Sequence, residues 1–310
     1  MKAIALDEFG GPEVLSLRDL PDPLLTPDGV LIDMRAAGVN PVDYKIREGY
    51  LRGAFPHHTP LIPGWDVAGV VAAVGPAVTA FAAGDEVYAY ARKDSVQFGT
   101  YAEKVVVADR AVARRPASLS LAQAGAVPLA GLTALQSLRD VGVRAGDTVL
   151  VHAAAGGVGH IAVQLAVAMG AARVFGTASP GNHDFVRSLG AQPLSYGPDL
   201  PEELAAAVGG DGKVDVALDY VGGEALTQSA QVVRDAARHG SIVDAKTALE
   251  QGGRYTFVRP DGDGLAYLGK LADEGKLLVE VQQEFPLAQA AEAQRLLAKG
   301  HVRGKLVLTV

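Results

Sequence analysis

The chain has 310 residues, more than one ordinary hydrophobic core organises, so two domains are the first expectation. Apolar residues make up 49% of the chain and charged residues 20%, a balance that excludes intrinsic disorder. The net charge of −7 is spread along the chain, which argues against a nucleic-acid or anionic-membrane surface. Cysteine is absent, so disulfides, thiolate zinc sites and a cysteine nucleophile are excluded.

The amino-terminal segment MKAIALDEFGG carries charges and has no long apolar core, so it is not typical of a secretory signal. The longest uncharged apolar stretch, near residues 161–172, falls short of the about 20 residues that span a bilayer. We therefore expect a cytoplasmic protein that has neither a membrane nor a nucleic acid as a partner.

The first part of the chain, residues 1–118, is typical of short strands separated by Gly, Pro and Asp. The expected strands are residues 2–6, 14–17, 30–36, 67–74, 86–89 and 103–107. Helical periodicity is scarce here, and the Pro-rich segments 21–29 and 52–64 are expected to be loops. The second loop is long enough to form the lip of a site. This pattern predicts a β-rich, partly closed barrel.

The pattern changes near residue 120 to alternating buried strands and helices, which is typical of a doubly wound α/β fold. Strands are expected at residues 147–152, 173–177 and 214–218, and helices near 157–169, 182–189 and 224–234. The tail adds a helix near 264–274, a strand at 277–281, a helix at 287–298 and the final apolar strand KLVLTV.

The strongest local signal is the segment DTVLVHAAAGGVGHIAVQLAVAMGA, residues 147–171. An apolar strand runs through small residues into a helix, the context that a GxGxxG dinucleotide-binding motif requires. Gly156 and Gly159 take the second and third glycine positions, where the backbone approaches a pyrophosphate and the helix approaches the strand. Ala154 takes the first position, which is compatible with the motif only if its φ is negative. A turn that merely packs tightly is the alternative, but the surrounding pattern favours nucleotide binding.

The end of the second α/β strand indicates which dinucleotide binds, because an acid there binds the ribose diol and repels a 2′-phosphate. Residues 177–183 contain no acid. Ser179 and Asn182 offer neutral hydrogen bonds, and His183 adds partial charge. The sequence therefore favours NADP(H) over NAD(H), although no Arg or Lys stands at this strand end to complete a phosphate clamp.

Several long motifs follow one another over nearly the whole chain: Ala36–Gly49, Pro60–Ala89, Gly131–Leu135, the glycine-rich loop, DYVGGEAL and HVRGKLVL. In these motifs the chain resembles the medium-chain dehydrogenase/reductase superfamily, and within it the zinc-independent quinone oxidoreductase branch that includes zeta-crystallin. The resemblance implies an α/β protein with two domains. A GroES-like β-rich catalytic domain would comprise residues 1–119, completed by 256–310, and a Rossmann NADP(H)-binding domain would comprise residues 120–255.

The resemblance also implies which residues hold the cofactor. Asn40 and Tyr44 would lie beside the nicotinamide, and Thr133 would contact the cofactor from a helix. The other implied contacts are Gly156, Gly157, Val158 and Gly159 at the pyrophosphate, Ser179 and Tyr196 near the 2′-phosphate, and Val221, Ala245, Gly304 and Lys305 along the nicotinamide half. Relatives often have a basic residue directly after this tyrosine, where this chain has Gly197.

A catalytic zinc ion is not expected. Alcohol dehydrogenases of the superfamily bind zinc through an early cysteine and the His of a GlyHisGlu element, so that the metal polarises an oxygen. Here Asn40 falls near the cysteine position, and the second element is Gly64, Trp65 and Asp66. Without a Lewis acid, hydride delivery to an already electrophilic quinone or α,β-unsaturated carbonyl is favoured.

Two residues are candidates for the chemistry. Tyr44 is a candidate proton donor or hydrogen-bond donor to a carbonyl, and Asn40 a candidate for orienting the substrate. Tyr44 is equally compatible with a wall residue whose hydroxyl bonds a backbone carbonyl. Whether any protein side chain donates a proton stays open.

Other conspicuous residues have structural interpretations. His57 and His58 are adjacent and have no third ligand nearby in the sequence, so they are not typical of a metal site. Trp65 could stack on a flat substrate or pack in the core, and both interpretations stay open. Asp66 and Asp85 are typical of turn or strand-end acids rather than of a catalytic pair.

The sequence thus predicts a zinc-independent, NADPH-dependent oxidoreductase that transfers hydride to quinones or α,β-unsaturated carbonyls. An enoyl-thioester reductase is one alternative, and a catalytically weak NADPH-binding redox sensor or structural protein is another. A homodimer is also expected, because relatives commonly pair through the edge of the Rossmann sheet. The contact would involve residues 238–244 and 254–258.

Overall fold

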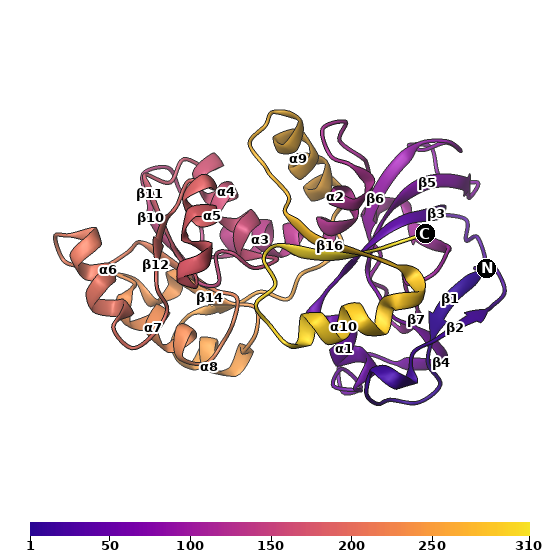
Figure 1. Ribbon diagram of the computed structural model, residues 1–310. Helices are drawn as coiled ribbons and strands as arrows, with labels where there is room; N and C mark the ends of the chain where they lie inside the picture. Colours follow the sequence, from indigo (N-terminus) through magenta and orange to yellow (C-terminus); the bar gives the residue numbers. More distant parts are fainter. The chain divides into compact units, whose positions relative to one another are not determined.

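The computed structural model describes all 310 residues, and backbone proximity divides them into two compact units. Unit 1 comprises residues 1–132, 259–275 and 279–310, and unit 2 comprises residues 133–258 and 276–278. Unit 1 therefore contains both ends of the chain, as the purple and yellow ribbon of Figure 1 shows.

A seven-stranded sheet forms the core of unit 1, in the order β16-β17-β3-β5-β6-β9, with β8 also paired to β3. Its strands are β3 (Gly29–Val39), β5 (Asp66–Val74), β6 (Glu86–Tyr90), β8 (Lys104–Ala108), β9 (Val112–Arg114), β16 (Val281–Pro286) and β17 (Lys305–Thr309). The long strand β3 is antiparallel to β5, β8 and β17, and its apolar residues face a common core. The tail of the chain thus completes the sheet that the amino-terminal residues begin.

Two small sheets flank this core. One pairs β1 (Lys2–Ala5) with β2 (Ser16–Asp19), and the other pairs β4 (His57–Ile62) with β7 (Val96–Phe98). The expected loop at residues 52–64 is therefore partly a strand. Backbone hydrogen bonds between Leu6 and Leu61, of 2.8 and 2.9 Å, explain this, because a non-local partner stabilises an extended segment that is rich in proline.

Helices of unit 1 are α1 (Pro41–Arg47), α2 (Leu121–Ala126), α9 (Gly262–Asp273) and α10 (Ala290–Ala298), with short 3₁₀ turns η1 (Pro12–Val14), η2 (Asp109–Ala111) and η5 (Leu287–Gln289). Helix α1 is too short to show periodicity, but Asn40 and Asp43 form a capping box at its start. Helix α2 packs against β3 and β5 and belongs to unit 1.

Unit 2 is a parallel six-stranded sheet in the order β12-β11-β10-β13-β14-β15. Its strands are β10 (Thr148–Val151), β11 (Arg173–Thr177), β12 (Gln192–Leu194), β13 (Val216–Asp219), β14 (His239–Ser241) and β15 (Arg254–Tyr255). Its helical segments are α4 (Gly159–Ala168), η3 (Pro180–Asn182), α5 (His183–Ser188), α6 (Leu200–Val208), α7 (Glu224–Val232), η4 (Ala236–Arg238) and α8 (Ala245–Glu250), and α3 (Pro128–Asp140) precedes β10.

This order confirms the predicted doubly wound α/β fold. The chain proceeds from β10 outward to β12 and then returns to β13 on the other side of β10. Ligands of such sheets bind outside the carboxyl ends of the strands where the order reverses. The turns after β10 and β13 are therefore the first place to look for a site.

The strand expected at residues 277–281 is absent, since β16 begins only at Val281. Leu277 and Val279 are buried, but the backbone of Leu278 pairs with a side chain instead of a strand. The Gln164 amide accepts from the Leu278 N–H at 2.7 Å and donates to its carbonyl at 2.9 Å. No helix in the structure combines the length and the apolar character that crossing a membrane requires.

Candidate functional site

A tight turn joins β10 to α4 in unit 2. Ala153 has a left-handed φ of 53°, whereas Ala154, the residue in the first glycine position, does not have a positive φ. Ala154 therefore has the negative φ that an alanine needs at the first glycine position of the motif. The Ala154 N–H donates to the Thr177 carbonyl at 2.9 Å, and the Ala153 N–H donates to Thr177 Oγ1 at 3.1 Å, which ties the turn to the end of β11.

The turn leaves no room for a side chain at Gly159 and little room at Gly156. A Cβ on Gly159 would lie 2.1 Å from the Ala153 carbonyl oxygen, and one on Gly156 would lie 3.3 Å from the same atom. Helix α4 begins at Gly159, and no side chain caps its first turn. The first N–H groups of a helix point outward and attract negative charge. A turn of small residues beside a helix start without a side-chain cap fits the pyrophosphate of a dinucleotide.

His160 supports this turn from inside. It is fully buried, and its Nδ1 lies 2.8 Å from the Gly156 carbonyl oxygen. It also packs beside Phe185, with ring centroids 6.4 Å apart. Its role is therefore to hold the loop in place.

Neutral polar groups gather after β11. The Asn182 side chain donates to Ser179 Oγ at 3.2 Å, and His183 Nε2 lies 3.2 Å from the Ala178 carbonyl oxygen. Tyr196, which follows β12, keeps 61% of its surface exposed. This strand end thus offers hydroxyl and amide groups and no carboxylate among residues 177–183, as the sequence indicates.

The turn after β13 is organised by Asp219, which is fully buried. One carboxylate oxygen accepts from the N–H groups of Val221 and Gly222 at 2.9 and 2.7 Å, and the other accepts from Ser241 Oγ at 2.7 Å. The side chain of Val221 remains 57% exposed. Asp219 therefore shapes a turn that presents Val221 beside the neighbouring β10 turn.

The predicted site residues fall into two groups. Unit 2 holds Thr133, the residues Gly156 to Gly159, Ser179, Tyr196, Val221 and Ala245. Thr133 is buried in α3, and Ala245 is the first residue of α8. Unit 1 holds Asn40, Tyr44, Gly304 and Lys305.

Asn40, Asp66 and Lys305 form a buried polar group in unit 1, hereafter the Asn40 cluster. Asn40 Nδ2 donates to Asp66 Oδ2 at 2.8 Å, while Lys305 Nζ donates to Asn40 Oδ1 at 2.5 Å and to the Val39 carbonyl at 3.1 Å. The ammonium of Lys305 lies 3.8 Å from Asp66 Oδ2. The Asn40 amide thus has one favourable orientation, because a flip would turn its NH₂ group toward the ammonium.

The sequence suggests that Asp66 is an ordinary strand-end acid, but its carboxylate is buried and bound by distant segments of the chain. It is fully buried, and its second oxygen accepts from the Leu129 N–H at 2.6 Å. Asp85, in contrast, does fit that interpretation. It accepts from the Ala82 N–H at 2.9 Å in a turn and pairs with Arg114 at 2.8 Å. Nothing in the sequence near Asp66 reveals its partners, since they come from distant segments.

Asp43 is a second buried acid that the sequence prediction omits. Its Oδ2 accepts from the Asn40 N–H at 2.8 Å and from the Tyr101 hydroxyl at 2.9 Å, and its Oδ1 has no hydrogen-bond partner. The segment Asn-Pro-Val-Asp contains a usable signal. An N-cap residue, a proline at the first helical position and an acid at the third are typical of a capped helix start.

Burial controls the ionisation of these groups. It raises the pKa of Asp43 to about 7, although the Asn40 N–H and Tyr101 oppose the shift. It raises the pKa of Asp66 to about 6, with the charge of Lys305 opposing it most strongly. Burial also lowers the pKa of Lys305, and the two carboxylates oppose that change. An unpaired buried carboxylate oxygen is costly, which is consistent with Asp43 holding a proton near neutrality.

Two aromatic residues have distinct surroundings. Tyr44 is half-buried, its hydroxyl makes no hydrogen bond, and burial and the nearby Glu48 raise its pKa. The expected alternative, a bond to a backbone carbonyl, is not formed. Trp65 is only 5% exposed and makes edge contacts with Phe55 and Tyr90 at centroid distances of 6.1 and 6.0 Å. It therefore packs in the core.

No group of three or more His, Asp and Glu side chains is placed so that it could hold a metal ion. His57 Nδ1 lies 2.8 Å from the Phe55 carbonyl oxygen, on strand β4. The two adjacent histidines therefore belong to the small sheet.

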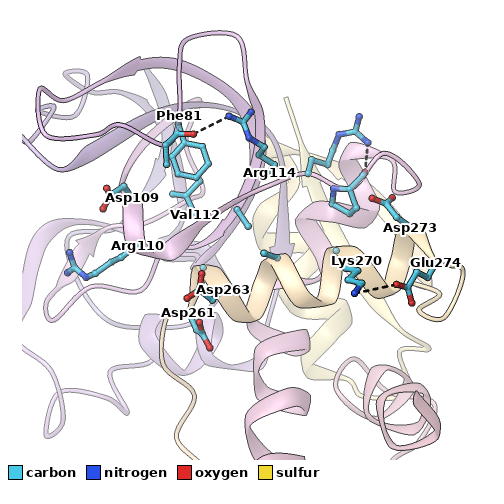
Figure 2. Close-up of a pocket in the computed structure, with 17 residues that line it drawn as sticks. Phe81, Asp109, Arg110, Val112, Arg114, Asp261, Asp263, Lys270, Asp273 and Glu274 are labelled. Atoms are coloured by element: carbon cyan, nitrogen blue, oxygen red, sulfur yellow. Dashed lines mark hydrogen bonds and ion pairs between the residues drawn. The ribbon is translucent and has the colours of Figure 1, made fainter. Parts of the chain in front are cut away.

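A groove of about 920 Å³ lies elsewhere in unit 1, between α9 and the segment around β9 (Figure 2). Several of its charged side chains are engaged with their own neighbours. Lys270 lies 3.8 Å from Glu274, Asp261 accepts from the Gly264 N–H at 2.9 Å, and Arg114 pairs with Asp85. None of the predicted site residues lines this groove.

Comparisons with known proteins match this arrangement. A model of the alcohol dehydrogenase GroES-like domain matches residues 26–117, and a zinc-binding dehydrogenase model matches residues 189–308. The chain is 36% identical to an NADPH-dependent alkenal/one oxidoreductase of Arabidopsis thaliana, over 99% of this chain and 79% of the relative. The solved quinone oxidoreductase of Coxiella burnetii is 37% identical, with a TM-score of 0.87, and covers 100% of this chain and 99% of its own.

The chain belongs to the quinone oxidoreductase branch of the medium-chain dehydrogenase/reductase superfamily. A further member, the Escherichia coli quinone oxidoreductase solved in complex with NADPH, is 28% identical, with a TM-score of 0.85 over the full length of both chains. The resemblance stated from the sequence is thereby confirmed, together with the fold class of a Rossmann domain and a GroES-like domain.

The raised pKa of Asp43 predicts a pH dependence of stability. Its pKa is 3.8 in a flexible chain and about 7 when folded, so between these values the folded state holds the extra proton. The free energy of unfolding therefore falls as pH rises through this window and is constant outside it. Asp43→Asn removes this contribution. The stability of the wild type relative to the variant is expected to be about 2 to 3 kcal/mol greater at pH 5 than at pH 8.

Urea unfolding of both proteins at the two pH values measures this difference. Asp85→Asn is the matched control, because ion pairing and hydrogen bonding lower the pKa of Asp85 and its titration lies below the window. Equal differences at pH 5 and pH 8 for Asp43→Asn would show that the buried carboxyl does not titrate as described.

Proposed function

We propose that this protein is a zinc-independent, NADPH-dependent oxidoreductase that transfers hydride to quinones or α,β-unsaturated carbonyls. The observation that carries the proposal is the tight turn of alanines and glycines between β10 and α4, in a chain that matches this family over 99% of its length. The Arabidopsis relative is an NADPH-dependent alkenal/one oxidoreductase, and the Escherichia coli relative is a quinone oxidoreductase solved with NADPH.

NADP(H) is the cofactor, and its nicotinamide supplies the hydride when it is bound. The residues Gly156 to Gly159 hold the pyrophosphate. The Gly156 N–H donates to the Ala153 carbonyl at 2.9 Å and shapes the turn, so the N–H groups of Gly157, Val158 and Gly159 are the ones directed at the anion. Ser179 and Tyr196 hold the 2′-phosphate, where no carboxylate repels it. The remaining cofactor contacts are Thr133, Val221, Ala245, Gly304, Lys305 and Asn40.

Asn40 and Tyr44 act on the hydride acceptor. The oxygen of a quinone or enone gains negative charge as hydride adds to the conjugated system, so a hydrogen-bond donor directed at it stabilises the transition state. The Tyr44 hydroxyl has no partner within the protein, and its raised pKa keeps it protonated near neutral pH. Asn40, held by Asp66 and Lys305, orients the acceptor or the nicotinamide.

The chemistry of the same residues supports the proposed zinc independence. The chain has no cysteine, and the amide of Asn40 is already engaged at both its oxygen and its nitrogen. The ammonium of Lys305 at 2.5 Å from Asn40 Oδ1 would also repel a divalent cation. The acceptor must therefore be electrophilic by itself, which favours quinones and enones over simple ketones.

The functional domains are part of the same proposal, with a catalytic domain of residues 1–119 completed by 256–310 and a cofactor domain of residues 120–255. A cytoplasmic location is also part of this proposal. We further propose a homodimer formed through β15, the edge strand of the unit 2 sheet. An edge strand offers unpaired backbone groups to a second copy. Size-exclusion chromatography at micromolar concentration is expected to give a dimer, and a clean monomer would remove this idea.

Turnover without metal tests the proposed function directly. After dialysis against a chelator, the protein is mixed with NADPH and, in separate reactions, with quinones, short enones or a crotonyl thioester. NADPH absorbance is expected to fall with quinones or enones, at the same rate before and after chelation. A preference for the thioester would select the enoyl-thioester reductase instead. Tight NADPH binding without turnover would select a sensor or structural role, and an absence of NADPH binding in calorimetry would overturn the proposal.

The coenzyme preference is predicted to reverse when an acid is placed after β11. Ser179→Asp brings a carboxylate to the position proposed for the 2′-phosphate, so kcat/KM should fall for NADPH and rise for NADH. The ratio of the two is expected to change by about tenfold or more, which corresponds to about 1.4 kcal/mol of differential binding. Ser188→Asp, on the exposed side of α5, is the control and should leave the ratio unchanged. An unchanged ratio in Ser179→Asp would place the 2′-phosphate elsewhere.

A further inference from the structure

We propose that Asp66 is a positioning residue for hydride transfer, acting through Asn40 and the start of α3, an inference that rests on the function proposed above. Asp66 is fully buried, and each of its carboxylate oxygens accepts a hydrogen bond from a different element. The side chain does not itself need to touch substrate or cofactor. Its effect is to fix two elements that carry proposed site residues.

The first element is the end of β3, where Asn40 caps helix α1. Asp66 Oδ2 accepts the Asn40 amide at 2.8 Å, and Lys305 occupies the opposite side of that amide at 2.5 Å. An anion on one side and a cation on the other give the amide a single orientation. If Asp66 were neutral, the buried ammonium would lose its nearest opposite charge, and the amide would lose its strongest acceptor.

The second element is α3, whose second residue, Leu129, donates its N–H to Asp66 Oδ1 at 2.6 Å. Thr133, a proposed cofactor contact, follows four residues later on α3, about one helical turn along the same face. The Asp66 carboxylate thus fixes the start of the helix that carries Thr133, while its other oxygen fixes Asn40. Misplacement of reacting groups by about 1 Å can cost about 100-fold in rate.

The charged and titratable groups that face Asp66 come from several elements. Lys305 on β17 supplies the positive charge, and Asp43 on α1 is an acid whose pKa burial raises to about 7. The hydroxyls of Tyr90 on β6 and of Tyr101 stay protonated, because burial raises the pKa of both. Within this set the pKa of Asp66 is about 6, so acid conditions neutralise it and remove the carboxylate that faces Asn40 and Lys305. Activity should therefore decline as pH falls through this value.

Asp66→Asn tests the inference, because it keeps the size of the side chain and removes its charge. With NADPH and the preferred acceptor, kcat is expected to fall about 100-fold. The KM for NADPH should change less than kcat does. In the wild type, kcat should have an acidic limb near pH 6, and in the variant this limb should disappear. A purely structural role would lower stability without removing a titration from the rate.

Further variants of this protein serve as controls for the test. Asp85→Asn is the matched control, since Asp85 lies in an exposed turn, and it should retain both the rate and the acidic limb. Asp66→Asn combined with Lys305→Met removes the unbalanced ammonium. This double variant should regain stability against urea relative to Asp66→Asn and still lack both the rate and the limb. Because Lys305 is itself a proposed cofactor contact, the double variant is compared with Lys305→Met alone, which should keep the acidic limb; this comparison carries the test if Asp66→Asn does not fold.

The outcomes separate the inference from the function on which it rests. If the wild type turns over and Asp66→Asn keeps its rate and its acidic limb, the positioning role is wrong and the proposed function stands. If recovery of stability in the double variant restores the rate, Asp66 serves folding alone, and the inference is overturned. If the wild type reduces no acceptor at all, the proposed function fails and the inference fails with it.

Discussion

The cost of burying charge is the constraint around which unit 1 is built. Two carboxyl groups and one ammonium, those of Asp43, Asp66 and Lys305, lie out of contact with water. Groups of this kind are rarely the most stable solution, because apolar residues of similar volume usually serve a core better. Asp66 and Lys305 are explained if they hold the Asn40 side-chain amide in one orientation for a reaction, and Asp43 is explained if it fixes the backbone of the same residue through its N–H. The raised pKa values of the two acids are then a consequence of placing a polar site inside a core.

The two units handle charge in different ways. In unit 2 the proposed pyrophosphate contacts are backbone groups, because Gly159 lets the turn come close to Ala153 and no side chain caps the start of α4. In unit 1 the proposed contacts to the acceptor depend on side chains, because Asn40, Asp66 and Lys305 hold one another in place by hydrogen bonds. Substitutions that add a side chain are expected to disrupt the turn between β10 and α4. Substitutions that change a charge are expected to disrupt the Asn40 cluster. The proposed chemistry needs both, since the cofactor carries phosphates and the acceptor gains negative charge.

Features that depend on neighbouring residues could be predicted from the sequence, and features that depend on distant partners could not. Strand β11 lies at the predicted residues because an apolar run between turn signals is a local pattern. The nucleotide-binding turn was predictable for the same reason. Helix α1 was missed because seven residues are too few to show a period, although its capping residues carry a signal. Strand β4 and the partners of Asp66 depend on contacts with remote segments, which a single sequence does not reveal.

The central claim is that hydride passes directly from NADPH to the acceptor without a metal. The most direct measurement uses NADPH deuterated at the transferable position of its nicotinamide, an α,β-unsaturated ketone and the chelator-treated protein, with mass spectrometry of the product. The account predicts one deuterium at the β-carbon of the product, and none at that carbon when unlabelled NADPH is used in heavy water. A product whose β-hydrogen comes from solvent, or a reaction that stops on chelation, would contradict it.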